Sequence, residues 1–277
     1  MSRAAHGAIN RSVPITLIPE RGELFTALER ALAGRRSTPV SAEVVINVAL
    51  QPPNSLLHDG HRWSRYTPSR MIALTRDAIR ATPRRGLLVH ASYAVAGATE
   101  AGIDAGDRLQ PIIDAALEAE DIVLRASVPA CVVRLGYLYG PDSRDLRAYR
   151  RAFLIGRPYW AGPSRVKQHF LHTADAARAL LSAARPGNEG RMLYATDDQP
   201  ASFASFMDLF AHLVGNPLPL HLPALSRQLS HVVVGEAHMQ MTDLPSAAID
   251  ARPRPRGFRP LFPTHRSGLR EVVKSWR

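Results

Sequence analysis

The sequence predicts an α/β fold, a doubly wound parallel sheet, on three observations. Two short apolar runs rich in β-branched residues, 44–49 and 87–92, lack in/out alternation, which is typical of strands buried on both faces. A segment with helical spacing, 69–81, lies between them. After residue 92, helical and extended patterns continue to alternate. Because ligands of such sheets bind beyond the carboxyl ends of the strands, Ala49 and Ser92 predict the position of the functional site.

The composition is that of a large globular protein. With 277 residues, 45% apolar and 21% charged, the chain can bury an ample core. It lacks an apolar run near the roughly 20 residues of a membrane helix, and residues 1–12 lack the apolar core of a signal peptide, so we expect a cytoplasmic protein with no membrane partner. The single cysteine, Cys131, lies in an apolar run and is interpreted as a buried structural thiol. His169 and His172 lack a third ligand nearby, and we expect no metal site.

The formal charge of +11 comes mainly from arginine and raises the question of nucleic-acid binding. The arginines are spread along the whole chain, and no helix-turn-helix, zinc-finger or RNA-binding motif accompanies them. The densest cluster has helical spacing and is interpreted as a solvated helix face, with an anion site for a phosphate-bearing substrate as the alternative; it comprises Arg144, Arg147, Arg150 and Arg151. We therefore expect a small-molecule substrate and no nucleic-acid partner. The oligomeric state stays open, and a homodimer is compatible with the sequence.

The remaining elements can be placed in chain order. The first 12 residues show no pattern and are expected to be flexible. A strand is predicted at 13–18 and a helix at 23–33. The proline-containing stretch 51–68 is expected to be a long loop beside the site.

The second half of the chain continues the alternation before it changes character. Helices and strands are predicted at 109–125, 130–135, 146–155, 170–171, 173–184, 192–195 and 203–214. Prolines break the pattern in the last sixty residues, so a small irregular lobe packed against the sheet edge is predicted there.

Several motifs, taken in order over roughly residues 40 to 270, carry a resemblance to a known family. They are the strand 44–49, the serine strand and loop 89–97, the turn 134–141, the helix start 169–177 and the segment 257–260. Together they resemble the extended short-chain dehydrogenase/reductase superfamily, which contains NAD-dependent sugar-nucleotide epimerases and dehydratases. The resemblance implies a Rossmann-like domain over 13–200, with a degenerate first strand–helix unit, and mainly a substrate lobe over 201–277.

The sequence departs from this family at the loop that binds the pyrophosphate. The family's Gly-x-x-Gly-x-x-Gly loop lets the backbone approach the pyrophosphate at a helix N-terminus. The corresponding turn, 19–23, has one glycine and two carboxylates, and Arg21 offsets only part of their repulsion. Alternatively, 13–18 is the family's second strand, the first unit is absent, and Glu20 stands where the family's acidic residue contacts the ribose. Both interpretations leave the dinucleotide site degraded, so NAD(P) is the cofactor that the resemblance implies, while its absence is also compatible with this loop.

The family's catalytic Tyr-x-x-x-Lys pair is missing as well. Aligning Glu120 with the family's glutamate on that helix places Ile112 and Ala116 at the tyrosine and lysine positions. No tyrosine lies between Tyr93 and Tyr137, so a small shift in register does not restore the pair. A replacement proton donor must come from another strand end.

The resemblance also assigns the candidate site residues. Ser92 aligns with the active-site serine, whose hydroxyl hydrogen-bonds the substrate oxygen. Tyr137 is the first candidate for the replacement proton donor and Tyr93 is the second. Ala49, Ser92 and Gly136 are the candidate cofactor contacts.

Three functions are compatible with these observations. The first is an atypical NAD(P)-dependent reductase or epimerase that acts on a carbonyl or hydroxyl group of a small metabolite. The second is a cofactor-independent cyclase, isomerase or lyase on the same scaffold, and the third is a non-catalytic ligand-binding protein. The first ranks slightly ahead because the serine strand, the Gly136 turn and the substrate lobe all persist.

Overall fold

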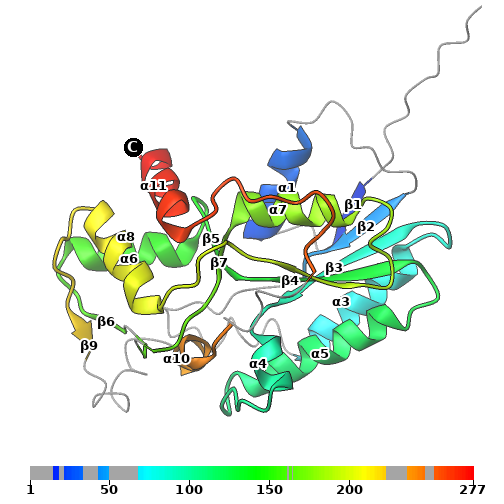
Figure 1. The fold of residues 1–277 in the computed structure, drawn as a ribbon, viewed down its shortest axis with the longest axis horizontal. Coiled ribbons are helices and arrows are strands. Elements are labelled where there is room, and N and C mark those ends of the chain that lie inside the picture. Colours follow the sequence, from blue (N-terminus) through cyan, green and yellow to red (C-terminus); the bar gives the residue numbers. More distant parts are fainter. Residues whose placement is uncertain are drawn as a thin grey trace, which may run out of the picture.

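The computed structural model describes residues 15–18, 22–33, 43–49, 68–160, 162–163, 165–222, 236–246 and 253–277. The predicted flexible N-terminus and almost all of the predicted long loop, up to residue 67, lie outside these residues. Within them, the centre is a parallel sheet of strand order β1-β2-β3-β4-β8, drawn in Figure 1. Its strands are β1 (Ile15–Ile18), β2 (Val44–Asn47), β3 (Leu87–Tyr93), β4 (Ala130–Leu135) and β8 (Met192–Ala195).

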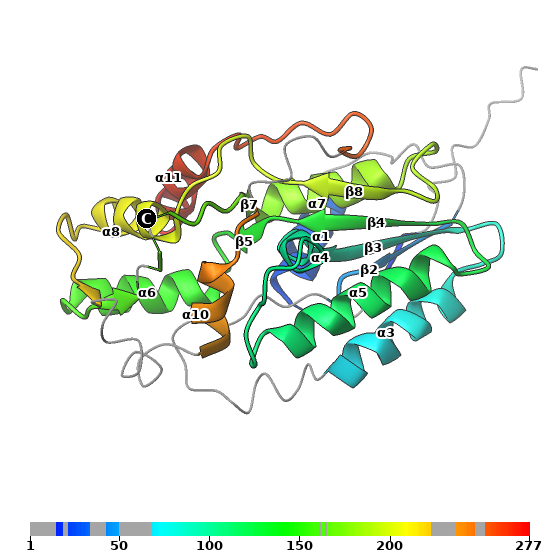
Figure 2. The ribbon, with the colours of Figure 1, turned by 60° about the horizontal axis from the view of Figure 1, so that its bottom comes forward.

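Helices cover both faces of this sheet, which confirms the predicted doubly wound α/β fold. Helices α1 (Glu23–Ala33) and α7 (Thr173–Ala183) lie on one face, and α3 (Pro68–Ala81) and α5 (Gln110–Leu124) on the other, as Figures 1 and 2 show. Every residue of β2, β3 and β4 is buried, the burial expected of strands without in/out alternation.

Alternate residues of the central strands point to opposite faces of the sheet. Leu88 and Val132 pack with Ala78 of α3 and Val123 of α5. Because side chains two residues apart share a face, His90 and Ser92 of β3 point to the same side as Leu88. The Cys131 thiol points to the other face, where it is buried against Ala183 of α7.

The position of β1 decides between the two interpretations of the first strand. Strand β1 pairs in parallel with β2, with Ile15 opposite Val44. In dinucleotide-binding sheets of strand order 3-2-1-4-5-6, the fourth strand neighbours the first and not the second. Strand β2 comes directly before the serine strand β3, and we match it to the fourth strand of the fold. Strand β1 is the neighbour of β2, so it corresponds to the first strand of the fold. Within the described residues β1 is an edge strand, and nothing among them takes the place of the fold's second and third strands.

A second layer of elements extends from the carboxyl edge of the sheet. Short parallel pairs join β5 (Tyr137–Tyr139) to β7 (Phe170–His172) and β6 (Tyr159–Trp160) to β9 (His221–Leu222). Helices α6 (Arg144–Leu154), α8 (Phe203–Leu213) and α11 (His265–Ser275) surround them at one end of the molecule, seen on the left of Figure 1. The core of this end of the molecule, called the aromatic end below, is built from aromatic side chains, with Phe170 stacked on Phe206 at a centroid distance of 4.2 Å.

Two short helices lie near the strand ends. Helix α4 (Ala96–Glu100) follows β3, and α10 (Glu236–Asp243) lies between the sheet domain and the aromatic end in both views. None of the described helices has the length and hydropathy needed to cross a membrane.

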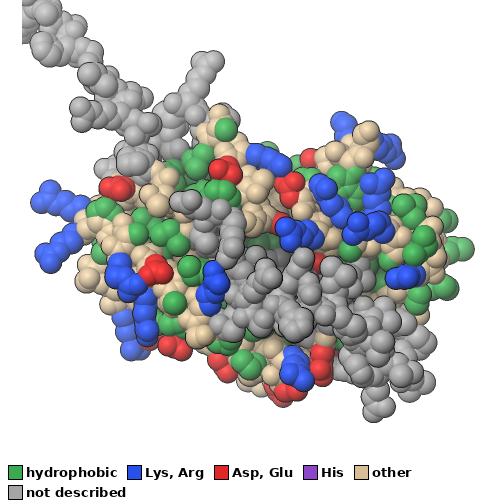
Figure 3. All heavy atoms as spheres, turned by 180° about the vertical axis from the view of Figure 1, so that it is seen from behind, with side chains coloured by type: hydrophobic (Ala, Val, Ile, Leu, Met, Phe, Trp, Pro, Cys, Tyr) green, Lys and Arg blue, Asp and Glu red, His purple; other side chains and the backbone are tan. Residues whose placement is uncertain are grey.

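Basic side chains lie at both ends of the face shown in Figure 3, and one group of Lys and Arg side chains (blue) lies over the end of the molecule that carries α6 and α11. The four arginines that the sequence placed on one helix lie in α6 or directly at its ends, and all are exposed: Arg144, Arg147, Arg150 and Arg151.

Candidate active site

The side chain of Ser92 lies at the carboxyl end of β3, where the sequence placed the site. Ser92 is 1% exposed, and its hydroxyl has no hydrogen-bond partner among the described residues. An unpaired buried hydroxyl costs roughly 1–3 kcal/mol, so native structures rarely keep one unless something else pairs with it. This hydroxyl is therefore a candidate ligand contact.

A buried ion-pair network supports the strand beside Ser92. Arg134 of β4 lies in register with Ser92, and its guanidinium donates to both carboxylate oxygens of Glu120 at 2.9 and 2.5 Å. It also donates to both oxygens of Glu100 at 2.6 and 2.7 Å and to the hydroxyl of Tyr194 at 2.8 Å. One side chain thus joins α4, α5 and β8 to the strand next to the candidate site.

The turn after β2 is held by a second buried network. The Asn47 amide donates to His90 Nδ1 at 3.0 Å, and its oxygen accepts from the Ala49 backbone N–H at 3.0 Å. Burial lowers the pKa of His90 to about 4, so the ring is neutral at pH 7 and Nδ1 accepts, which leaves the proton on Nε2. Ala49, a candidate cofactor contact, is thereby fixed and 3% exposed.

Tyr137, the first candidate proton donor, begins β5 directly after the Gly136 turn. Its ring packs edge-on against Phe170, Phe203 and Phe206 at centroid distances of 5.6, 5.9 and 6.3 Å. Burial, reinforced by nearby acidic groups, raises the pKa of Tyr137 well above its usual value. Tyr137 can therefore donate a hydrogen bond, but burial disfavours the phenolate that remains after proton transfer.

The other predicted site residues are built into the packing. Tyr93 is 7% exposed and belongs to the main core, as do Ile112 and Ala116 at the positions of the family's tyrosine and lysine. A Cβ atom on Gly136 would lie 2.9 Å from the carbonyl oxygen of His169. Glycine at this position lets the turn between β4 and β5 approach the residue before β7 closely, and this packing explains the glycine without a cofactor.

At the N-terminus of α1 the structure carries a carboxylate. Gly22, with φ of +110°, makes the turn into the helix, and Glu23 is its first residue. The Glu23 carboxylate accepts from the backbone N–H of Arg144 at 3.0 Å and so caps α6. Burial raises the pKa of Glu23 to about 6, which leaves it mostly ionised at pH 7. A negative charge stands beside the helix end that binds the pyrophosphate in dinucleotide-binding folds.

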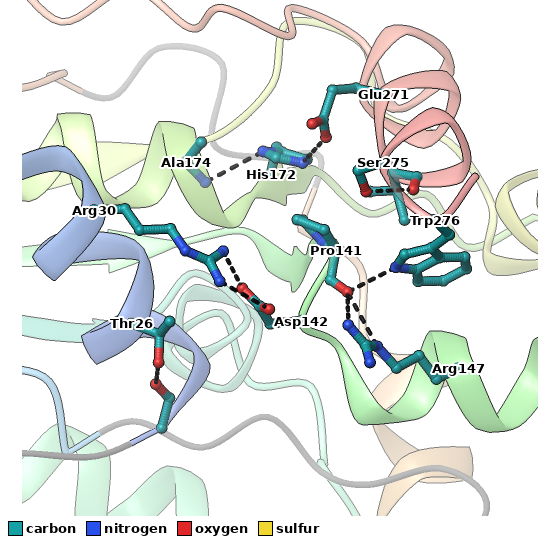
Figure 4. A network of polar contacts seen from close by, with 12 residues as sticks. Thr26, Arg30, Pro141, Asp142, Arg147, His172, Ala174, Glu271, Ser275 and Trp276 are labelled. Carbon is teal, nitrogen blue, oxygen red and sulfur yellow. Dashed lines mark hydrogen bonds and ion pairs between the residues drawn. The ribbon is translucent and has the colours of Figure 1, made fainter. Parts of the chain in front are cut away.

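Further contacts tie α1 and α11 to the loop between β5 and α6. Arg30 of α1 pairs with Asp142 at 2.5 Å, and Arg147 donates to the carbonyl of Pro141 at 2.9 Å (Figure 4). The Trp276 indole donates to the same carbonyl at 2.8 Å, and the guanidinium of Arg150 lies 5.6 Å from its ring centroid. Two of the clustered arginines therefore anchor the C-terminal end of the chain.

A nicotinamide dinucleotide would meet different conditions at its two halves. At the strand ends, the unpaired Ser92 hydroxyl is available to a group of the reactive half. At the pyrophosphate half, Glu23 opposes phosphate, and the described sheet ends at β1, so it lacks the reversal of strand order at which dinucleotides bind. The described residues therefore oppose the cofactor at its pyrophosphate and offer it a polar partner at the strand ends.

The structure adds one titratable group that the sequence did not single out. His238 of α10 is 0% exposed and contacts the rings of Tyr137 and Phe203 at centroid distances of 6.3 and 5.0 Å. Its segment has no clear helical period, so only the placement of α10 brings it beside Tyr137.

Comparisons with known proteins support the fold. None of the protein-family models matches the chain. A curated relative, a 3-diazoavenalumate denitrifying reductase from a Streptomyces species, is 33% identical over 162 residues, which are 57% of this chain and 51% of the relative. The chain thus matches about half the length of that relative.

Solved structures match over nearly the whole chain at low sequence identity. The human epimerase family protein SDR39U1 (isoform 2) with NADPH has a TM-score of 0.69 and 17% identity, with 94% of this chain and 99% of that chain covered. RMD from Pseudomonas aeruginosa complexed with NADPH has a TM-score of 0.63 and 19% identity, with 95% and 98% covered. A short-chain dehydrogenase/reductase superfamily protein from Agrobacterium tumefaciens with bound NAD has a TM-score of 0.58 and 16% identity, with 95% and 97% covered. The predicted resemblance is confirmed at the level of the fold.

Proposed function

We propose that this chain, which has the fold of the extended short-chain dehydrogenase/reductase superfamily, is a reductase that acts on a small electrophilic metabolite with NAD(P)H as the reductant. The observation that carries the proposal is the buried, unpaired hydroxyl of Ser92 at the end of the central strand β3. The reductase name of the curated relative and the NADPH or NAD bound in the similar structures support it.

The buried residues at the strand ends have different roles. Ser92 donates a hydrogen bond from its hydroxyl to the substrate, and the Asn47–His90 pair holds the neighbouring strand end in place. Arg134 and Glu120 fix the strand beside Ser92. When bound, the nicotinamide supplies the hydride. Because Ser92 is buried, a hydrogen bond that it donates to a substrate acceptor is stronger than the same bond in water.

We further propose that the hydride acceptor is an aryl diazo group. Reduction of a carbonyl leaves an alkoxide that needs a proton, and the positions of the family's proton-transfer pair are Ile112 and Ala116 here. An aryl diazonium ion that accepts hydride at its terminal nitrogen becomes a neutral aryl diazene, which leaves no alkoxide to protonate. The diazene then loses N2, and its hydrogen ends on the ring carbon, so that the diazonium ion and one hydride give the arene and N2. The name of the curated relative supports this class of acceptor.

A turnover assay tests the proposal. The wild-type chain is incubated with NADPH and either para-hydroxybenzaldehyde or an ortho-hydroxy aryl diazonium salt, and oxidation of NADPH is followed together with the aromatic product. We expect enzyme-dependent loss of NADPH and formation of the denitrified phenol, with a much slower reaction of the aldehyde. A mixture without protein measures the background reaction of the diazonium salt. Equal rates with and without protein for both acceptors would contradict the proposal.

A cofactor-independent isomerase or lyase on the same scaffold is the second candidate. The position of Glu23 at the N-terminus of α1 favours it, because a carboxylate there opposes pyrophosphate binding. Turnover of a substrate without any nicotinamide nucleotide would select it.

A further inference from the structure

We infer that the imidazole of His238 contacts the substrate and donates a hydrogen bond to it, so that α10 supplies part of the polar machinery that the missing tyrosine and lysine supply in the family. The inference rests on the proposed function, since it concerns the same site. It also assigns a role to a helix from the C-terminal part of the chain.

Helix α10 is locked in place at its side toward the sheet domain. The Gln240 side-chain oxygen accepts from the backbone N–H groups of Arg108 and Leu109 at 3.1 and 2.9 Å, at the start of α5. Its amide donates to Asp107 at 2.7 Å. A Cβ atom on Gly106 would lie 2.5 Å from the Gln240 side chain, so glycine makes room for this contact.

The other side of α10 is tied to the aromatic end of the molecule. The Trp160 indole donates to Thr242 at 3.0 Å. The Gln168 amide donates to the carbonyl oxygen of Leu244 at 2.8 Å and to that of Met241. With both sides held, α10 bridges the sheet domain and the aromatic end, as Figure 2 shows, and the position of His238 is fixed.

The surroundings of His238 leave its polar atoms unused. Both ring nitrogens are buried and neither has a hydrogen-bond partner among the described residues. The rings of Tyr137 and Phe203 pack against it in T-shaped contacts. Buried polar atoms of native proteins are nearly always paired, because burying one without a partner is unfavourable. Two such atoms on a rigidly held ring, beside a residue of the strand-end turn, are expected where a ligand supplies the partner.

The chemistry available to this ring is that of a neutral donor. Burial lowers the pKa of His238 to about 3, so the ring carries a single N–H at pH 7. A neutral imidazole N–H can polarise an acceptor group of a substrate without transferring a net charge. The loss of one preorganised donor typically lowers kcat by about 10²–10³-fold.

His265 offers a matched control. It is also buried, at 3% exposed, both of its ring nitrogens are unpaired among the described residues, and it packs against Phe170 and Phe206. It differs from His238 in that, within the described part of the chain, its ring packs on these two phenylalanines and not on Tyr137. A general effect of removing a buried histidine would therefore appear in both variants, and an effect on the substrate only in the His238 variants.

The kinetic test compares His238→Phe, His238→Gln and His265→Gln in the NADPH assay with the acceptor that the wild-type chain reduces. We expect His238→Phe to lower kcat about 10²-fold with the Kd of NADPH unchanged, and His238→Gln, which keeps an N–H donor, to recover part of the loss. His265→Gln should keep the wild-type kcat. Wild-type kcat and KM in His238→Phe would overturn the inference.

A second readout needs no turnover. In the chain labelled with ¹⁵N-histidine, we expect the ring signals of His238, assigned with His238→Gln, to move when para-hydroxybenzaldehyde is added, while those of His265 stay in place. If the wild-type chain fails to oxidise NADPH but the His238 signals move, the proposed reductase fails and the ligand contact stands. Unmoved His238 signals, or equal movement of both histidines, would overturn the contact.

Discussion

Arg134 of β4 and Glu120 of α5 form a bidentate ion pair inside the protein, with side chains that are 0% and 3% exposed. Arg134 also stands in register with Ser92 on the neighbouring strand. The pair explains the burial of a glutamate on α5, a helix whose other inward-facing residues are apolar. It also links the stability of the sheet to the geometry of the candidate site.

Breaking this pair should destabilise the protein strongly. Glu120→Ala leaves the Arg134 guanidinium with one fewer buried partner, and we expect a loss of about 3–5 kcal/mol in the free energy of unfolding, measured by urea denaturation. The exposed pair of Arg80 and Asp77 on α3 is the control, because Asp77→Ala should cost only about 0–1 kcal/mol. Similar losses of unfolding free energy in the two variants would contradict a larger contribution of the buried pair to stability.

Removing the Ser92 hydroxyl should lower activity without lowering stability. Because this buried hydroxyl has no partner among the described residues, Ser92→Ala should raise the free energy of unfolding by up to about 1–3 kcal/mol while lowering kcat by about 10²-fold. Ser143, whose side chain caps α6 by accepting from the Leu146 N–H, is the opposite case. Ser143→Ala should lose about 1 kcal/mol of stability and retain turnover. Wild-type turnover by Ser92→Ala would show that Ser92 is not an active-site residue.

Glu23 should weaken the binding of NADPH. Glu23→Gln keeps an oxygen for the Arg144 N–H and removes the negative charge, so we expect about tenfold tighter binding, or ~1.4 kcal/mol, by calorimetry. Since the pKa of Glu23 is raised to about 6, wild-type binding should tighten as pH falls from 7 to 5, and this trend should vanish in the variant. Glu29→Gln, on an exposed position of the same helix, controls for net charge. Equal affinities of all three proteins would contradict this role.

Acid should unfold the protein through its buried histidines. Burial lowers the pKa to about 4 or below in four of them, against an ordinary value near 6.5, and they are His90, His172, His238 and His265. Between pH 6.5 and about 4 the unfolded chain therefore binds protons that the folded chain does not. Stability falls as pH drops through this window, by about 1.4 kcal/mol per pH unit for each proton.

Four carboxyl groups oppose this trend. Burial raises the pKa of Asp197 and of Glu23 to about 6, and it also raises the pKa of Asp175 and of Glu271, so the folded chain binds protons that the unfolded chain releases. The histidines still dominate, because the downward shifts of all four are large, whereas only two of the carboxyl shifts are. We expect the Tm to fall between pH 6.5 and 5, and a Tm that is constant or rises toward pH 5 would contradict this balance.

Much of the fold could be predicted because burial on both faces leaves a plain mark in the sequence. The runs 44–49, 87–92 and 130–135 became β2, β3 and β4, since apolar residues without alternation suit strands covered by helices on both sides. Helix α11 was not predicted, because the prolines around it hid the pattern. Its start did carry a signal, a capping box in which Thr264 and Ser267 bond each other's backbone N–H groups.

The site could be predicted only where it depends on strand ends. Ser92 lies at the carboxyl end of β3, where the fold class places ligands. His238 reaches the site through contacts such as that of Gln240 with Arg108, which are 132 residues apart in the chain, and no local pattern encodes such a contact. Gly136 is a second position at which the sequence alone was not sufficient. A glycine in a turn gives the same sequence signal whether a cofactor or, as here, another backbone segment approaches it.

Titration of the purified full chain with NADPH and NADH by calorimetry tests the central claim most directly. The account predicts one binding site with a Kd in the micromolar range or tighter for at least one of the two nucleotides, despite the carboxylate of Glu23. A chain that binds neither reduced nucleotide at pH 7 or at pH 5.5, where Glu23 is largely protonated, would contradict the reductase and leave the scaffold to cofactor-independent chemistry or ligand binding.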